Sequence, residues 1–256
     1  MIIDAHVHTY NRSHNALLGS RCSQEIVIRA REAGIDRIVI SSLGRTAYLP
    51  YPSSQEVREA NDDVLKLMQE FPEEVYGLCY LNPRNPDWRE EMQRCYDRGM
   101  IGIKLWIAVK ASSAILFPVI EAAMQRDLFI QQHSYLKNRG NYSDESEPFD
   151  VARLGIEYPQ ARIIMAHAGG NRREGLEAIA PMPNIYVDTS GGVPECGVVE
   201  NAVAILGSQR VLFGSDAPGR SYTVQQAKIT AANIPDAVKH QIMGNNFQGF
   251  IRYEDN

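Results

Sequence analysis

The feature that most constrains the fold is a repeated alternation of short apolar runs with longer stretches of helical spacing. Between the runs lie segments such as Ser53–Glu70 and Asp87–Arg98, whose apolar residues recur every three or four positions. Strands that alternate with helices pair in parallel through right-handed crossovers. Eight runs have the length and composition of buried strands: Ile2–His8, Arg37–Ser42, Val75–Leu81, Gly102–Trp106, Leu128–His133, Arg162–His167, Asn184–Asp188 and Arg210–Ser215.

Eight such units in 256 residues predict an α/β fold, a (β/α)8 TIM barrel, better than an open sheet. No linker, low-complexity tract or block of like charge divides the chain, so we expect one domain over residues 1–256. Gly34, Gly99 and Gly207 stand where left-handed helix ends are expected. In this fold the active site lies at the carboxyl ends of the strands.

Composition excludes several classes of function. Lysine and arginine number 26 against 31 acidic residues, and this net charge of -5 argues against a nucleic-acid partner. No run approaches the ~18 apolar residues of a membrane span, and Met1–Asp4 does not begin a secretory signal. The four cysteines form no CxxC pair, which indicates free thiols in a reducing compartment. We therefore expect a cytoplasmic protein with a small-molecule substrate, and leave open whether it forms a homodimer.

Four of the six histidines each end a predicted strand, and Asp216 ends the eighth. Because the carboxyl ends of barrel strands converge on one rim, these side chains should meet there. The four histidines are His6, His8, His133 and His167. The two-residue period of a strand predicts that Asp4, His6 and His8 face the interior, and that Ile3, Ala5 and Val7 face the helices.

Such a cluster is typical of a catalytic metal site. A single histidine at a strand end is more often a hydrogen-bonded polar group, but four buried imidazoles and a carboxylate are costly to desolvate unless they bind something. Imidazole nitrogens and carboxylate oxygens suit zinc and similar divalent ions. We expect one divalent metal ion, Zn²⁺, with one coordination position open to water or substrate.

Lys104 is predicted to face the interior with Gly102 and Trp106. Three interpretations of this buried position remain open. Lys104 is carboxylated and bridges two metal ions, or it stays an ammonium group that neutralises Asp216 or the substrate, or its side chain extends to solvent.

These motifs together resemble the amidohydrolase superfamily, and in particular its amidohydrolase-2 branch of metal-dependent hydrolases and ACMS-decarboxylase-like enzymes. The resemblance spans almost the whole chain, and five motifs in this order are specific where a single HxH is not. The motifs are Asp4-Ala-His6-Val-His8, Gly102-Ile-Lys104-Leu, Gln132-His133, Met165-Ala-His167-Ala-Gly169-Gly170 and Phe213-Gly-Ser-Asp216-Ala-Pro218.

The resemblance implies that His6, His8 and His133 ligate one metal ion, with Asp216 as a further ligand and proton acceptor. Such an ion lowers the pKa of a bound water from ~15.7 towards ~7. His167 would polarise the reacting carbonyl, and Asp4 would hold an imidazole N–H. A carboxylated Lys104 would change these roles, because His133 and His167 would then hold a second metal ion.

Substrate contacts are predicted from residues near the rim. Trp106 stands where many relatives carry a histidine after GIKL, so a flat indole wall is expected there. Tyr135 lies in Ser134–Pro148, a segment without helix or strand pattern that we interpret as a lid or binding loop. Cationic residues also follow the strands: Arg12, Arg45, Lys137, Arg139, Arg172, Arg173 and Arg220. Of these, Arg172 and Arg220 are the best candidates to clamp a substrate carboxylate.

Four functions are consistent with these features to different degrees. The leading one is metal-dependent hydrolysis of a C–N or C–O bond in a small amide, lactone or ester. The alternative is non-oxidative decarboxylation of an unsaturated or aromatic acid in the same pocket. A nuclease resembling the TatD family is opposed by the net charge and by Lys104, which stands where that family has a glutamate. A barrel that keeps its metal only for stability would have every coordination position filled by protein.

Overall fold

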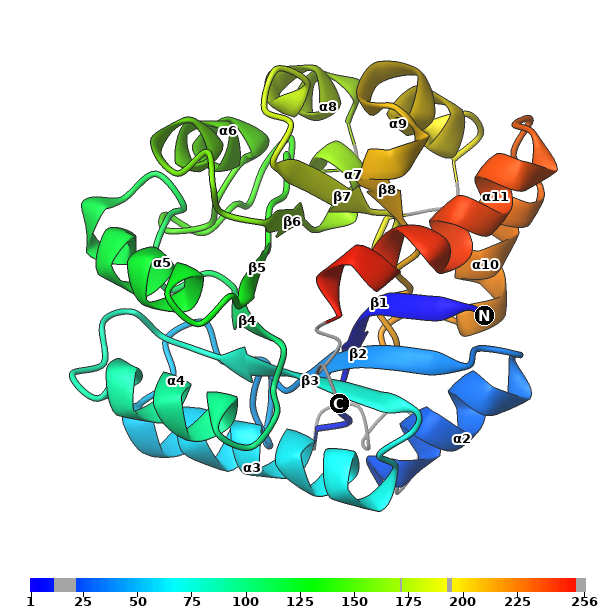
Figure 1. Ribbon diagram of the computed structural model, residues 1–256. Helices are drawn as coiled ribbons and strands as arrows, with labels where there is room; N and C mark the ends of the chain where they lie inside the picture. The colour runs from blue at the N-terminus through cyan, green and yellow to red at the C-terminus, as the bar shows by residue number, and fades with distance from the viewer. Residues whose placement is uncertain (12–21, 171, 193–194, 252–256) are drawn as a thin grey trace.

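The structure is a computed structural model that describes residues 1–11, 22–170, 172–192 and 195–251. Eight parallel strands follow one another around the sheet in chain order, which confirms the predicted (β/α)8 barrel. These strands form a ring (Figure 1). Their bounds are β1 Ile3–His8, β2 Arg37–Ser41, β3 Val75–Tyr80, β4 Gly102–Leu105, β5 Phe129–Gln132, β6 Ile163–Met165, β7 Ile185–Asp188 and β8 Val211–Leu212.

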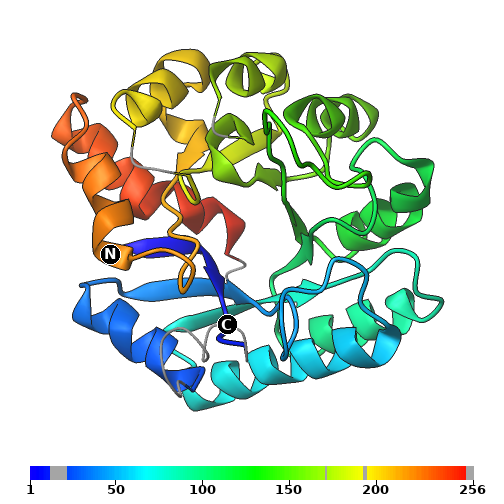
Figure 2. The ribbon, with the colours of Figure 1, turned by 180° about the vertical axis from the view of Figure 1, so that it is seen from behind.

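Helices surround the ring on its outer side, as both views show (Figures 1 and 2). The longest begins at a capping box, in which Ser53 and Glu56 satisfy each other's backbone N–H groups. The α-helices are α2 Gln24–Glu32, α3 Ser54–Glu70, α4 Trp88–Tyr96, α5 Phe117–Met124, α6 Pro148–Glu157, α7 His167–Gly170, α8 Arg173–Ile179, α9 Val198–Leu206, α10 Tyr222–Thr230 and α11 Asp236–Met243. Three short 3₁₀ helices are η1 Ala114–Leu116, η2 Ser208–Arg210 and η3 Asn245–Phe250.

Backbone hydrogen bonds between β1 and the segment after β8 close the barrel. Ala5 N donates to Phe213 O over 2.8 Å, and His8 N donates to Ala217 O over 2.7 Å. Asp216 N donates to His6 O over 2.8 Å. The chain from Phe213 to Ala217 therefore runs beside β1 although β8 itself is shorter than predicted, and this places Asp216 next to His6.

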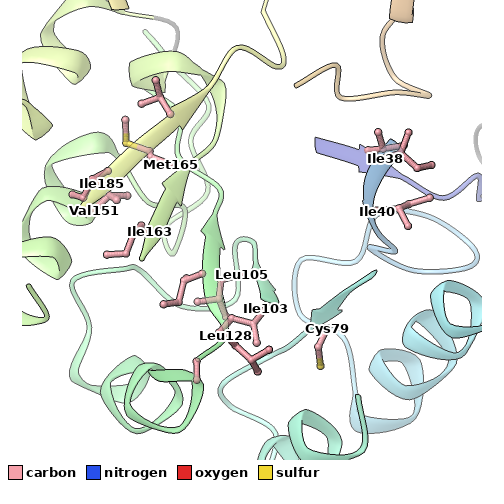
Figure 3. Close-up of a cluster of buried hydrophobic side chains, with 14 of the residues drawn as sticks. Ile38, Ile40, Cys79, Ile103, Leu105, Leu128, Val151, Ile163, Met165 and Ile185 are labelled. Atoms are coloured by element: carbon pink, nitrogen blue, oxygen red, sulfur yellow. The ribbon is translucent and has the colours of Figure 1, made fainter. Parts of the chain in front are cut away.

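The main hydrophobic core lies between the sheet and the helices. Its side chains alternate along the strands, as Ile38 and Ile40 of β2 or Ile103 and Leu105 of β4 show (Figure 3). Val151 of α6 packs against this layer from the helix side. The outward half of each strand thus stabilises the barrel, and the inward half is left for the interior.

The predicted alternation of β1 is wrong at its amino end. Ile3 and Ala5 belong to an apolar cluster with inward residues of other strands, whereas Val7 belongs to the layer under the helices. The pairing of β1 with β2 shifts between Asp4 and Val7. Such an irregularity inserts one residue into the two-residue alternation. His6 and His8 consequently face the interior as predicted, while Asp4 does not.

The amino end of the barrel interior is filled with apolar side chains. Phe129 contacts Phe247 and Phe250 of η3, with ring centroids 5.9 and 5.2 Å apart. The η3 segment, coloured red, turns inward across the ring of strands (Figure 1). Ile164 and Leu212 complete the same cluster. This end of the barrel is a packed core, so a site can form only at the other end.

The glycine-based helix ends agree with expectation. Gly34, Gly99 and Gly207 have φ values of 76°, 87° and 83°, the left-handed region that only glycine enters at little cost. Within the part of the chain described here, no helix is long and apolar enough to cross a membrane.

Candidate active site

Side chains from the first strand, β1, and from the segment after the last strand, β8, meet at the carboxyl rim of the barrel. His6 Nε2 lies 3.1 Å from His8 Nε2. Asp216 Oδ1 lies 3.9 Å from His6 Nε2 and 3.6 Å from His8 Nε2. Ligand atoms bonded to one tetrahedral ion at about 2.0–2.2 Å are themselves roughly 3.4 Å apart. The three atoms therefore have the spacing of a cation site.

The chemistry of His6 supports the same interpretation. Its Nδ1 lies 2.9 Å from Asp188 Oδ2, and because a carboxylate can only accept, Nδ1 carries the proton. Burial, and then the charge of Lys104, hold the pKa of His6 well below its usual value, so the ring is neutral and its Nε2 has a lone pair. That lone pair points towards His8 Nε2, where a cation would bind both rings.

A second group of potential ligands is bridged by a hydroxyl instead. Ser190 Oγ lies 2.9 Å from His6 Nδ1 and 3.0 Å from His167 Nδ1, and it donates to Asp188 Oδ1. Asp188 also accepts the backbone N–H of His167 over 3.2 Å. Although the side chains of His6, His167 and Asp188 could in principle hold an ion, their hydrogen bonds to Ser190 indicate a polar network that orients the two imidazoles.

Lys104 lies between these groups and is only 1% exposed. The prediction that its side chain could extend to solvent is wrong. Its Nζ lies 3.0 Å from His6 Nε2 and donates to Gln131 Oε1 over 3.1 Å. Burial lowers the pKa of Lys104 to about 8, against the opposing charges of Asp188 and Asp216. The position suits a charge partner of the cluster, as predicted for one of the three interpretations.

His133 and His167 form a separate pair in the interior. His133 Nδ1 lies 3.1 Å from His167 Nε2, and His133 Nε2 lies 2.9 Å from Glu145 Oε1. Burial lowers the pKa of both imidazoles, so they too are neutral bases. Among the described residues, the group of closely spaced ligand atoms at Asp216 consists of His6, His8 and Asp216, and His133 is not in it.

Backbone strain is concentrated at this rim. His167 and Asp216 have φ values of 70° and 64°, in the left-handed region that non-glycine residues rarely enter. Strain of this kind costs about 1–3 kcal/mol per residue and is found at sites where it positions a functional group. Burial raises the pKa of Asp216 to about 7, although Lys104 and Arg220 lower it. Asp216 therefore combines an unusual backbone with an unusually basic carboxylate.

Three aromatic rings lie close to the histidines of the site. Tyr48 lies 5.5 Å from the His8 ring and 5.8 Å from Trp106, measured between ring centroids. Trp106 lies 6.2 Å from His133. Tyr135 lies 6.2 Å from His133, with the two rings stacked, and 5.4 Å from His167. These three half-buried side chains place flat aromatic surfaces beside His8, His133 and His167.

With the geometry described, the sequence pattern of the amidohydrolase family matches residues 3–246. The chain belongs to this amidohydrolase family. A comparison with curated protein sequences finds no match.

Solved structures with the same fold include several decarboxylases of aromatic acids. The 5-carboxyvanillate decarboxylase of Sphingomonas paucimobilis has a TM-score of 0.77 and 17% identity, with 97% of this chain and 98% of that chain covered. The 2,6-dihydroxybenzoate decarboxylase of Rhizobium has a TM-score of 0.79 and 16% identity over the same shares. A dihydroxybenzoic acid decarboxylase of Polaromonas, solved with bound manganese and the inhibitor 2-nitroresorcinol, has a TM-score of 0.78 and 17% identity, with 97% and 96% covered. At this identity the similarity shows the fold.

The two arginines predicted to bind substrate lie differently in this amidohydrolase. Arg172 is half-buried, donates through Nε to Leu136 O over 3.1 Å and also donates to Asn138. With Tyr135 and Lys137 it lines a hollow of about 420 Å³. Arg220 is exposed, and its charge lowers the pKa of Asp216. Arg12 lies outside the described residues.

Three residues of the site, Asp4, Ser190 and Glu145, were misassigned or missed at the level of sequence. Asp4 does not hold an imidazole: its Oδ1 accepts the backbone N–H groups of His6 and Ser215 over 3.1 and 2.9 Å. Asp188 contacts the His6 ring instead. The inward position of Asp188 at the end of a strand indicates a place in the polar network, whereas Ser190 and Glu145 lie in irregular segments with no such signal.

Proposed function

We propose that this amidohydrolase catalyses the metal-dependent, non-oxidative decarboxylation of an aromatic or otherwise unsaturated carboxylic acid. This function was the alternative at the level of sequence, where hydrolysis of an amide, lactone or ester came first. The observation that carries the proposal is the set of aromatic rings, Tyr48, Trp106 and Tyr135, beside the histidines of the site. The activities of the three structurally similar decarboxylases support it.

These rings suit a flat substrate. Aromatic rings favour offset-stacked and edge-to-face contacts with another ring, with centroids about 4.5–7 Å apart. Trp106 is roughly perpendicular to both Tyr48 and His133, at interplanar angles of 77° and 78°. A planar acid seated between such rings would direct its carboxylate to the histidines. Arg172 and Arg220 are proposed to contact polar substituents at the outer edge of that ring.

One divalent ion is proposed to bind His6 Nε2, His8 Nε2 and Asp216 Oδ1, with His133 as a further ligand. When bound, the ion supplies Lewis-acid stabilisation to the substrate's oxygen atoms. Zn²⁺ was the predicted ion, and the ligand types suit both it and Mn²⁺. Elemental analysis of the purified protein distinguishes the two metals.

The protein's own groups then manage one proton. Loss of CO₂ leaves an electron pair on the ring carbon, and that carbon must take a proton. Asp216 is proposed to hold this proton on Oδ2, the carboxylate oxygen not assigned to the ion, and to deliver it. His167, which contacts Ser190 and His133, is proposed to lie beside the substrate oxygen where charge develops.

The test is a product analysis on the metal-loaded enzyme with 2,6-dihydroxybenzoate, 5-carboxyvanillate and related acids. Decarboxylation in D₂O should release CO₂ and place one deuterium on the carbon that carried it. The same enzyme is assayed in H₂¹⁸O with lactones and cyclic amides, because hydrolysis would incorporate ¹⁸O into the product. Turnover with ¹⁸O incorporation and without CO₂ would reject decarboxylation and restore the hydrolase. Asp216→Asn should abolish either reaction and serves as the blank.

A further inference from the structure

Glu145 is a buried carboxylate that no sequence motif includes. It is 1% exposed and lies in the irregular segment between β5 and α6. Its Oε1 lies 2.9 Å from His133 Nε2. Its Oε2 accepts from Lys137 Nζ over 2.8 Å and from the backbone N–H of Tyr142 over 3.1 Å. A carboxylate with this many donors is held in one place, and it faces a histidine of the site.

The contact determines which nitrogen of His133 carries the proton. A carboxylate accepts hydrogen bonds, so His133 Nε2 carries the proton and Nδ1 has the lone pair. That Nδ1 lies 3.1 Å from His167 Nε2. A half-turn of the imidazole about its bond to Cβ would put carbon atoms where the two nitrogens now are. Without Glu145, therefore, neither the ring orientation nor the proton position would be specified.

The neighbouring residues show that Glu145 is specifically placed for this role. Asp144, the preceding residue, contacts Tyr51 and Arg84 on two other loops, at 3.2 and 3.4 Å. Lys137 lies on the far oxygen of Glu145, where it offsets the negative charge without touching His133. Asp144 thus connects this loop to its two neighbouring loops. Glu145 contacts His133 in the interior.

We propose that Glu145 is a positioning residue, which holds His133 with Nδ1 turned inward as the nitrogen offered to the divalent ion. The inference rests on the metal site of the proposed function. Carboxylate partners of metal-binding histidines fix the ring orientation and raise ligand basicity, and their removal typically lowers metal affinity by about 10–100-fold. The hydrogen bond to a charged acceptor is also stronger than one to a neutral group.

The test measures Zn²⁺ affinity of the apo-protein by competition with a chromogenic chelator, with no assay of turnover. Glu145→Ala should weaken binding by about 10–100-fold. Glu145→Gln keeps an acceptor oxygen without the charge, so it should give a smaller loss and remains informative if the alanine variant does not fold. Asp144→Asn is the matched control and should bind as the wild type does. The melting temperature of each apo-protein reports folding separately from binding.

Two further measurements separate positioning from a general structural role. Side-chain ¹⁵N NMR of His133 should show the proton on Nε2 in the wild type and a mixture of tautomers in Glu145→Ala. In a His133→Ala background, the Glu145 substitution should have no additional effect on Zn²⁺ affinity. Wild-type affinity in a folded Glu145→Ala protein, or an equal loss in the His133→Ala background, would overturn the proposal. Absence of stoichiometric Zn²⁺ binding by the wild type would instead reject the metal site of the proposed function.

Discussion

The two ends of the barrel interior have opposite chemistry although the same strands build both. At the amino end, Phe129 of β5 packs against Phe247 and Phe250. Four residues further along the chain, His133 faces Glu145 and His167. Between them Gln131 marks the boundary, since it donates to Ala5 O over 2.6 Å and accepts from Lys104.

The difference teaches what each end contributes. Burial of apolar side chains stabilises the fold by about 25 cal/mol for each Å² removed from water. Burial of polar groups costs free energy unless each finds a partner, and the rim histidines find theirs in carboxylates and hydroxyls such as Asp188, Ser190 and Glu145. The carboxyl end is costly to bury, and its backbone is strained at His167 and Asp216. Such a combination is typical of a functional site. Stability and activity should therefore respond to different substitutions.

The largest effect is expected at the apolar end. Phe129→Ala removes a fully buried ring that two other aromatic rings contact, so the free energy of unfolding should fall by about 3–5 kcal/mol. Denaturant unfolding of the apo-protein measures this. Zn²⁺ affinity of the protein that remains folded should be unchanged. If the substitution also weakens Zn²⁺ binding in folded protein, the two ends are coupled and the contrast between them fails.

Metal removal is the corresponding experiment at the polar end. An ion that binds only the folded state at one hundred times its dissociation constant stabilises by about 2.7 kcal/mol. Adding Zn²⁺ at that ratio to the apo-protein should therefore raise the free energy of unfolding by this amount, and a chelator should reverse it. His6→Ala removes a proposed ligand and should abolish the gain. An equal Zn²⁺ gain in His6→Ala would show that the ion binds elsewhere.

A smaller effect is expected where backbone geometry supports the polar end. A Cβ on Gly191, which has a φ of 68°, would lie 2.4 Å from His167 Nδ1. Gly191→Ala should cost about 1–3 kcal/mol from backbone strain, and turnover should fall because the imidazole must move. Gly34→Ala is the matched control, with a φ of 76° and nothing within 4 Å of the added Cβ. If both variants retain full turnover, the close approach of Gly191 does not position His167.

The contrast between the two ends also explains what could be predicted. The order of the strands, and the histidines that end them, are properties of the chain itself, because a polar residue that follows an apolar run is visible in the sequence. The family resemblance was confirmed over residues 3–246. The strands were predicted to be longer than they are, most of all β8. There Phe213 N donates to Ile242 O, and the pairing with β7 ends at Leu212.

The partners of the histidines could not be predicted in the same way. The shift in β1 is a property of strand pairing, and nothing in the pattern of Asp4 to Val7 marks it. Ser190 and Glu145 approach His167 and His133 from segments with no periodic structure. Their positions depend on how loops fold against the finished barrel. Sequence patterns therefore predicted the groups that do chemistry better than the groups that orient them.

The smallest effect is expected just outside the rim, at Arg45. Arg45 follows β2, as Arg172 and Arg220, the proposed substrate contacts, follow their strands. Its guanidinium, however, makes two hydrogen bonds to Asp63 of α3, at 2.7 and 2.8 Å. Its side chain is 46% exposed, so Arg45→Ala should cost only about 0.2–1 kcal/mol, and less at high salt. KM for the acid substrate should not change, whereas Arg172→Ala should raise it. A guanidinium already engaged by Asp63 has little left to offer a second carboxylate, so an increase in KM on loss of Arg45 would contradict this expectation and place Arg45 among the substrate contacts.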